Sequence, residues 1–175
     1  MADALLERAR TLRAAFDRSF QVERVVSDAQ RFDFLTIRVA SERHALRLPE
    51  VLGLYTERRL VPAPSRLPAL VGLSAFRGVV TPVYDLGVLL GYRATARATS
   101  WLVVARGSAP IGFSFDGFDA HLRAAEADLV AAPAASSSEA SAALRVGDGV
   151  IPLLDLPRLI ESVARAATTA LRQEP

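Results

Sequence analysis

The sequence predicts a mainly β protein made of two small five-stranded β-barrels, flanked by a helix at each end of the chain. Three features of the sequence lead to this fold class. Two stretches alternate between apolar and polar residues as β-hairpins do, a short motif recurs 70 positions further along, and prolines and glycines separate the apolar runs. With 175 residues, 51% of them hydrophobic, the chain can bury the core of one ordinary domain or of two very small ones.

Each predicted barrel begins with a hairpin. In the first hairpin, apolar residues alternate over 32–39, a polar break follows at 40–43, and a second strand covers 45–48. In the second hairpin, the strand at 101–105 turns through a segment with Gly and Pro and returns at 111–115. The second hairpin therefore repeats the first.

Proline and small residues mark the connections between the remaining strands. Residues 61–68 contain three prolines, which lack a backbone donor, so this segment is predicted to be an extended loop. Strand character resumes at 76–84. The Ala- and Ser-rich residues 131–143 predict a surface loop, and the glycines within 146–150 predict a tight hairpin turn.

A motif that occurs twice is the best indication of a duplicated fold. Residues 82–86, PVYDL, match residues 152–156, PLLDL, and two apolar residues lie three and four positions after each motif. Each copy predicts the end of a strand followed by a helix capped by Asp85 or Asp155, and the first helix should end at Gly91. Two pseudo-equivalent barrels explain the repeat, because a five-stranded barrel closes its own edges within about 60 residues. A chance match of the pattern is the alternative.

Helices are predicted at both ends of the chain. Residues 4 to about 27 and residues 156–171 place apolar side chains at intervals of three or four, as amphipathic helices do. The apolar face of the first helix would pack on the body of the domain or on another protein. The predicted organisation is an N-terminal helical extension (1–31), a domain (32–161) with a first barrel at about 32–95 and a second at about 98–155, and a C-terminal helix and tail (156–175).

No residue pattern in the sequence indicates catalysis or a cofactor. The chain has no cysteine, and its two histidines, His44 and His121, lie in no catalytic or metal-binding motif. Glycine motifs that bind phosphate are absent, and Asp85 and Asp155 are better explained as helix caps than as a catalytic carboxylate pair. We therefore expect a protein that is not an enzyme and that binds neither a metal ion nor a cofactor.

Charge and hydropathy argue against two further classes of protein, those that bind nucleic acid and those that insert into a membrane. The net charge is only +2 and the arginines are interleaved with acidic residues, so we expect no binding to nucleic acid. No run of about 18 apolar residues occurs, so we expect no direct insertion into a membrane. The absence of cysteine and of a secretion signal predicts a cytoplasmic protein.

Residues 32 to about 161 resemble the CheW-like domain family of bacterial chemosensory adaptors. Residues 72–86, GLSAFRGVVTPVYDL, are similar to the family signature G-x-x-N-L-R-G-x-x-x-P-V-x-D-L. Two positions depart from the family: Ala75 stands where the signature has Asn, and Gly53 stands where an acidic residue is common. Both positions lie where family members contact their partners, so the receptor and the kinase of this protein should be unusual.

The resemblance implies two SH3-like barrels, no active site, and signalling by contact. It implies that the regulatory domain of a CheA-type histidine kinase binds an apolar end of the first barrel, formed by Val51, Leu52 and Gly72. It also implies that the cytoplasmic tip of a methyl-accepting chemoreceptor binds in a groove between the two barrels, near a turn formed by Arg77 and Gly78. The residues themselves leave open core and turn packing for the first set, and an internal ion pair or carbonyl contact for Arg77.

The expected function is a non-enzymatic adaptor that couples a chemoreceptor to a CheA-type kinase in a chemosensory array. Such a protein would be cytoplasmic and recruited to receptor arrays at the membrane. Two alternatives remain open. One is a CheW-like scaffold for type IV pilus or gliding-motility signalling with altered partners, and the other is a small-barrel protein that binds nucleic acid.

Overall fold

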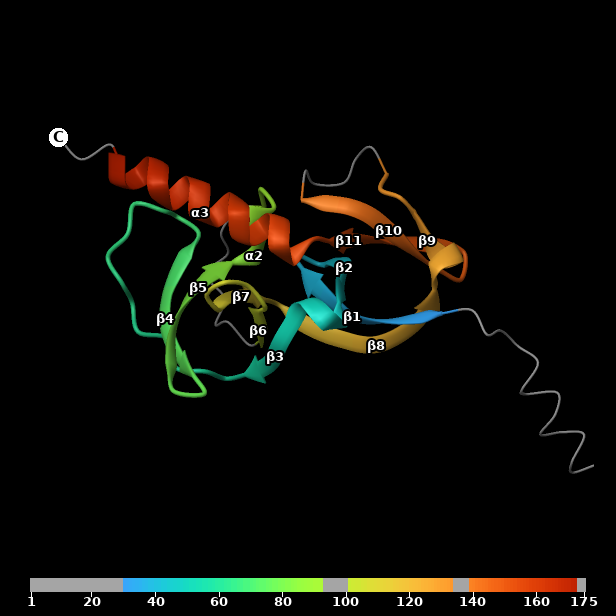
Figure 1. Cartoon of the computed structure of the whole chain (residues 1–175), viewed down its shortest axis with the longest axis horizontal. Helices are drawn as coiled ribbons and strands as arrows, with labels where there is room; N and C mark the ends of the chain where they lie inside the picture. Colours follow the sequence, from blue (N-terminus) through green and yellow to red (C-terminus); the bar gives the residue numbers. More distant parts are fainter. Residues whose placement is uncertain (1–29, 93–100, 134–138, 173–175) are drawn as a thin grey trace, which may run out of the picture. The chain divides into compact units, whose positions relative to one another are not determined.

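The structure is a computed structural model that describes residues 30–92, 101–133 and 139–172. These residues form two β-sheets with helices packed against them (Figure 1). Sheet A has six strands in the order β8 (Gly117–Ala125), β1 (Arg31–Val39), β2 (Glu42–Arg47), β11 (Gly149–Leu154), β10 (Ala140–Val146) and β9 (Leu129–Ala131). Sheet B has five strands in the order β3 (Val51–Thr56), β6 (Trp101–Ala105), β7 (Ile111–Phe115), β5 (Val79–Asp85) and β4 (Leu70–Phe76).

The predicted hairpins are present. β1 and β2 are joined by Ala40 and Ser41, whose φ angles of 50° and 75° are both positive, as a two-residue type I′ turn requires. β6 and β7 pair antiparallel along their whole length. β10 and β11 turn at Gly147, which has a φ of 58° that glycine adopts without strain. These three hairpins confirm the sequence prediction.

The recurring motif marks equivalent strands in the two sheets. β4 and β5 form a hairpin in sheet B, and β10 and β11 form one in sheet A. The register shifts between Leu70 and Gly72 in the first hairpin and between Ala140 and Ala142 in the second. β5 then pairs in parallel with β7, and β11 pairs in parallel with β2. The repeat in the sequence is therefore a repeat in the structure.

The strands are not distributed as we expected from the barrels at about 32–95 and 98–155. The first hairpin, β1–β2, joins sheet A through β11, and the second hairpin, β6–β7, joins sheet B through β5. Each sheet therefore contains strands from both halves of the chain. A hairpin pattern predicts local pairing but carries no information about which distant strand completes the sheet.

The expected closure into five-stranded barrels is also corrected. The sheets have six and five strands, and in the described residues no ladder joins the edge strands β8 and β9 of sheet A or β3 and β4 of sheet B. Sheet B instead brings its edges together through side chains: Tyr55 of β3 contacts Phe76 of β4, with ring centroids 4.8 Å apart. Contact between side chains curls the sheet without completing a ring of backbone hydrogen bonds.

The two loops predicted from the sequence, 61–68 and 131–143, agree with the structure to different degrees. Residues 61–68 have no strand of their own, but Val61 and Leu73 exchange two backbone hydrogen bonds of 2.8 Å. Ala142 and Ala143 of the predicted loop 131–143 instead lie in β10, where Ala143 is fully buried. The prediction of a loop was wrong there, because the low β-propensity of alanine is outweighed by pairing with β9 and β11. Residues 134–138 lie outside the described residues.

Two α-helices follow the equivalent strands β5 and β11. α2 (Leu86–Leu89) is capped by Asp85, whose Oδ1 accepts the Val88 N–H at 3.1 Å. α3 (Leu156–Arg172) begins after Asp155, whose Oδ1 accepts the Arg158 N–H at 3.0 Å. Both caps were predicted from the motif. The predicted helix at 4–27 lies outside the described residues.

One apolar core joins both sheets and both helices (Figure 1). It includes Leu35, Ile37 and Leu46 from sheet A, Val103 and Phe113 from sheet B, and Leu86, Leu156, Leu159 and Val163 from the helices. A 3-10 turn, η1 (Leu48–Glu50), links β2 of sheet A to β3 of sheet B. Glu50 in this turn accepts the Leu156 N–H at 3.2 Å, so the crossover between the sheets also caps α3.

Candidate protein-binding surface

The turn between β4 and β5 consists of Arg77 and Gly78. Their φ angles are 50° and 82°, so Arg77 occupies a conformation in which glycine or asparagine is more usual. The Arg77 side chain is exposed and makes no hydrogen bond or ion pair with the described residues. The internal ion pair considered from the sequence is therefore absent from the described part of the chain, and the guanidinium is available to a partner.

A hollow of about 140 Å³ lies beside this turn. It brings together Leu52 of β3, expected at the kinase site, and Arg77 of the β4–β5 turn, expected at the receptor site. The hollow is lined by Leu52, Tyr55, Phe76, Arg77, Val79, Val104 and Pro110. The two predicted sites therefore adjoin each other at one end of sheet B.

Aromatic contacts hold the hairpin tip in place. Phe76, directly before the turn, is 5% exposed and packs with Val83, Leu102 and Val104. Its contact with Tyr55 extends outward to Arg58, whose guanidinium carbon lies 4.9 Å from the centre of the Tyr55 ring. Cation–π contact with an arginine is favourable for a partly exposed tyrosine. The position of Arg77 is thus set by a packed side chain on its N-terminal side.

Val51 and Gly72 do not lie on this surface as Leu52 does. Val51 is partly buried and packs against the shared core. Gly72 is buried with a φ of 156°, and a Cβ atom there would lie 2.5 Å from the Val61 carbonyl oxygen. Gly72 therefore allows the proline-rich loop of the same chain to approach β4, which gives this glycine an internal role.

The structure adds apolar residues that the sequence analysis did not include. Val79 and Val80 follow the turn and are 49% and 68% exposed, and Val61 of the proline-rich loop is 57% exposed. Two adjacent valines after an Arg-Gly turn were a usable signal, because alternate residues of a strand point to opposite faces and one of them must face outward. Exposed apolar residues of this kind are candidates for a protein contact.

The two departures from the signature have different surroundings. Ala75 is exposed on β4, so a side chain there can meet a partner. Gly53 is covered by the ring of Tyr55, because a Cβ at Gly53 would lie 2.7 Å from the Tyr55 hydroxyl oxygen. The glycine and the tyrosine therefore replace an acidic side chain with an aromatic surface at this position.

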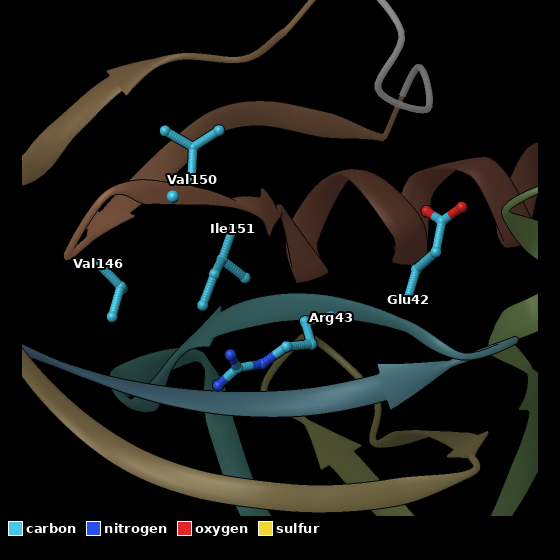
Figure 2. A pocket seen from close by; sticks show the side chains of 6 residues that line it. Glu42, Arg43, Val146, Val150 and Ile151 are labelled. Carbon is cyan, nitrogen blue, oxygen red and sulfur yellow. The ribbon is translucent and has the colours of Figure 1, made fainter.

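A second hollow, of about 360 Å³, lies beside the equivalent hairpin of sheet A (Figure 2). Val146, Val150 and Ile151 of the β10–β11 hairpin lie on one side of it, and Arg43 of β2 lies on the other. Arg43 and Arg38 both form ion pairs with Asp119 of β8, at 3.4 Å and 2.8 Å. Unlike the first hollow, this one contains no aromatic residue.

The described residues contain no group of three or more side chains suited to hold a metal ion. His121 Nε2 lies 2.8 Å from Asp33 Oδ1 on the surface of sheet A, and Arg123 lies 3.3 Å from the same oxygen. An exposed arrangement of this kind is an ordinary surface ion pair.

Comparison with known proteins identifies the family of this chain. The sequence model of the CheW-like domain matches residues 33–164. The chain belongs to the CheW-like domain family. Among solved structures, the scaffolding protein TtCheW from Thermoanaerobacter tengcongensis has a TM-score of 0.69 to this chain at 17% identity, and the match covers 75% of this chain and 94% of that one. No curated protein matches the chain.

The CheW-like signature occupies one continuous unit of the fold. Residues 72–86 run from β4 through the Arg77-Gly78 turn and β5 to the start of α2. The similarity to TtCheW shows that the fold is shared as well. In this chain the fold has two sheets, of six and five strands. No helix among the described residues is both long enough and apolar enough to cross a membrane.

Proposed function

We propose that this CheW-like protein is a non-enzymatic, cytoplasmic adaptor that couples a chemoreceptor to a CheA-type histidine kinase. The observation that carries the proposal is the match to the CheW-like domain over residues 33–164. The exposed apolar residues beside Arg77, which has no ion-pair partner among the described residues, support it, because they offer a contact surface at the signature turn.

The apolar part of this surface suits the regulatory domain of the kinase. Leu52, Val79 and Val80 are 38%, 49% and 68% exposed, and covering them would remove apolar area from water at roughly 25 cal/mol per Å². Val51 supports Leu52 from the core side, and Gly72 supports β4 by letting the proline-rich loop pack on it. In this proposal Leu52 contacts the kinase directly, while Val51 and Gly72 shape the surface.

Arg77 suits the cytoplasmic tip of a receptor. An arginine guanidinium offers a positive charge and five N–H donors to carboxylates or carbonyl oxygens. The Gly78 that follows leaves the turn without a side chain on that side, since no atom lies within 4 Å of a Cβ built there. A receptor hairpin could therefore approach the Arg77 side chain closely.

The test separates the two contacts. Arg77→Glu should reduce receptor binding by at least roughly tenfold, because it places a negative charge where a positive one is needed, and should leave kinase binding unchanged. Leu52→Asp should do the reverse. Pull-down with receptor fragments and calorimetry with the kinase regulatory domain measure the two affinities.

Arg145→Glu is the matched control, because Arg145 is an exposed arginine on the equivalent strand of the other hairpin. It should change neither affinity, and all three variants should melt within a few degrees of the wild type. If Arg77→Glu lowers the melting temperature strongly and both partners are lost together, Arg77 is a structural residue and the receptor site lies elsewhere.

A CheW-like scaffold in pilus or gliding-motility signalling would use the same surface with other partners. Ala75 and the aromatic cover over Gly53 favour this alternative, because both alter a contact position of the family signature. Calorimetry with the regulatory domains of kinases from both kinds of pathway would distinguish them. The tighter binding partner identifies the pathway.

A further inference from the structure

His44 is a buried ionisable residue without a hydrogen-bond partner among the described residues. It lies on β2, is 3% exposed, and neither Nδ1 nor Nε2 has a hydrogen-bond partner in the described part of the chain. Burial lowers the pKa of His44 below its ordinary value of 6.5, and the charge of Glu42 opposes only part of this shift. His44 is therefore neutral at pH 7 and places two polar nitrogens in an apolar core.

Glu42 lies on the same face of β2, because residues two apart along a strand point in the same direction. Its Oε2 accepts a hydrogen bond of 2.6 Å from the Tyr92 hydroxyl. Burial and this hydrogen bond raise the pKa of Tyr92 to about 12. Tyr92 comes after α2, which continues from sheet B, whereas Glu42 begins a strand of sheet A. The Tyr92–Glu42 hydrogen bond therefore ties the end of α2 to sheet A.

The elements near His44 offer it no other charged partner among the described residues. On β1 its register partner is the apolar Ile37, and the neighbouring Arg38 is exposed and paired with Asp119. β11 and α2 contain no charged residue, and Arg158, Glu161 and Arg165 of α3 are exposed. Glu42 is the charged group that acts on the imidazole.

We propose that His44 makes the tie between α2 and β2 sensitive to acid. On taking up a proton from solvent, the imidazolium draws the Glu42 carboxylate away from the Tyr92 hydroxyl. A buried imidazolium needs acceptors for two N–H donors, and its charge-assisted bond to a carboxylate is stronger than the bond from a phenol. The end of α2 then loosens from sheet A. This inference is independent of the proposed partners.

The direction of the pH effect follows from the lowered pKa. Because the folded protein binds the proton less tightly than the unfolded chain, the stability from neutral His44 is complete above about 6.5 and is lost as the pH falls through the folded value. The hydrogen bond from Tyr92 should weaken as the pH falls through the lowered pKa of His44 in the folded protein.

An NMR titration of the full chain from about pH 8 to about pH 5 tests the proposal. The ring signals of His44 and Tyr92 are followed. We expect the Tyr92 signals to move with the titration of His44. In Glu42→Gln this link should disappear. Tyr92 signals that stay fixed while His44 takes up its proton would overturn the proposal.

Tyr92→Phe provides a second test that retains the ring. Without the hydroxyl, Glu42 is free to receive the imidazolium, so coupling requires the His44 titration to move to higher pH. We expect a shift of about half a pH unit, roughly a threefold change in proton affinity. An unchanged His44 titration in this variant would show that Tyr92 and His44 do not compete for Glu42.

Discussion

The β4–β5 hairpin of sheet B and the β10–β11 hairpin of sheet A have the same backbone plan and different surfaces. Both have a register shift at the same distance from the turn, and both lead into a helix capped by an aspartate. Yet Phe76 before the first turn is 5% exposed, whereas Val146, its counterpart in the second hairpin, is 36% exposed.

The difference follows from what lies beneath each tip. Phe76 contacts Tyr55 on the opposite edge of sheet B, and the hollow beside this hairpin is about 140 Å³. The hollow beside the sheet A hairpin is lined by aliphatic and charged residues and is about 360 Å³. A duplicated backbone can therefore carry two unlike surfaces, because a single pair of side chains decides how closely the tip is held.

The largest loss of stability should come from removing the Phe76 ring, which holds the tip of the β4–β5 hairpin. Phe76→Ala deletes a buried ring and its contact with Tyr55, so we expect the free energy of unfolding to fall by about 3–5 kcal/mol. Val146→Ala is the matched control in sheet A and should cost less than about 1 kcal/mol, because that side chain is partly exposed. Urea denaturation measures both. Equal costs would mean that the aromatic pair does not distinguish the hairpins.

A smaller effect should come from the glycine at the register shift of β4. Gly72→Ala places a Cβ 2.5 Å from the Val61 carbonyl oxygen at a φ of 156°, so we expect a loss of about 2–4 kcal/mol. The equivalent residue of β10 is already an alanine, and Ala142→Gly should cost only about 1 kcal/mol. Thermal unfolding of both variants checks this. A Gly72→Ala protein with wild-type stability would show that the proline-rich loop is not held against β4.

The smallest loss of stability should come from removing the helix caps, and it should differ between Asp85 and Asp155. Asp85→Ala removes the side-chain acceptor of the Val88 N–H and should cost about 1 kcal/mol. Asp155→Ala should cost less, because Glu50 still accepts the Leu156 N–H at the start of α3. Chemical denaturation of Asp85→Ala, of Asp155→Ala and of the double variant Glu50→Ala/Asp155→Ala measures the loss of stability in each. If Asp155→Ala alone costs as much as the double variant, Glu50 does not act as a second cap.

Part of the candidate surface could be predicted from the sequence. The signature placed Arg77 and Gly78 at a turn, and the structure has them there with positive φ angles. Val51, Leu52 and Gly72 were expected on one apolar patch, but only Leu52 faces the hollow. The register shift between Val51 and Gly53 changes which side chains face outward, and such a shift leaves no clear mark in the pattern of residue types.

The sequence by itself determined the local elements of this protein. Turn residues and alternation predicted three hairpins, and the repeated aspartates predicted two helix caps, because each of these signals acts between residues close in the chain. Only the tertiary structure decided that β2 pairs with β11 and β7 with β5. The hairpins β1–β2 and β6–β7 have similar sequence patterns. Which sheet each of them joins therefore depends on side-chain packing across the shared core, which residue spacing does not encode.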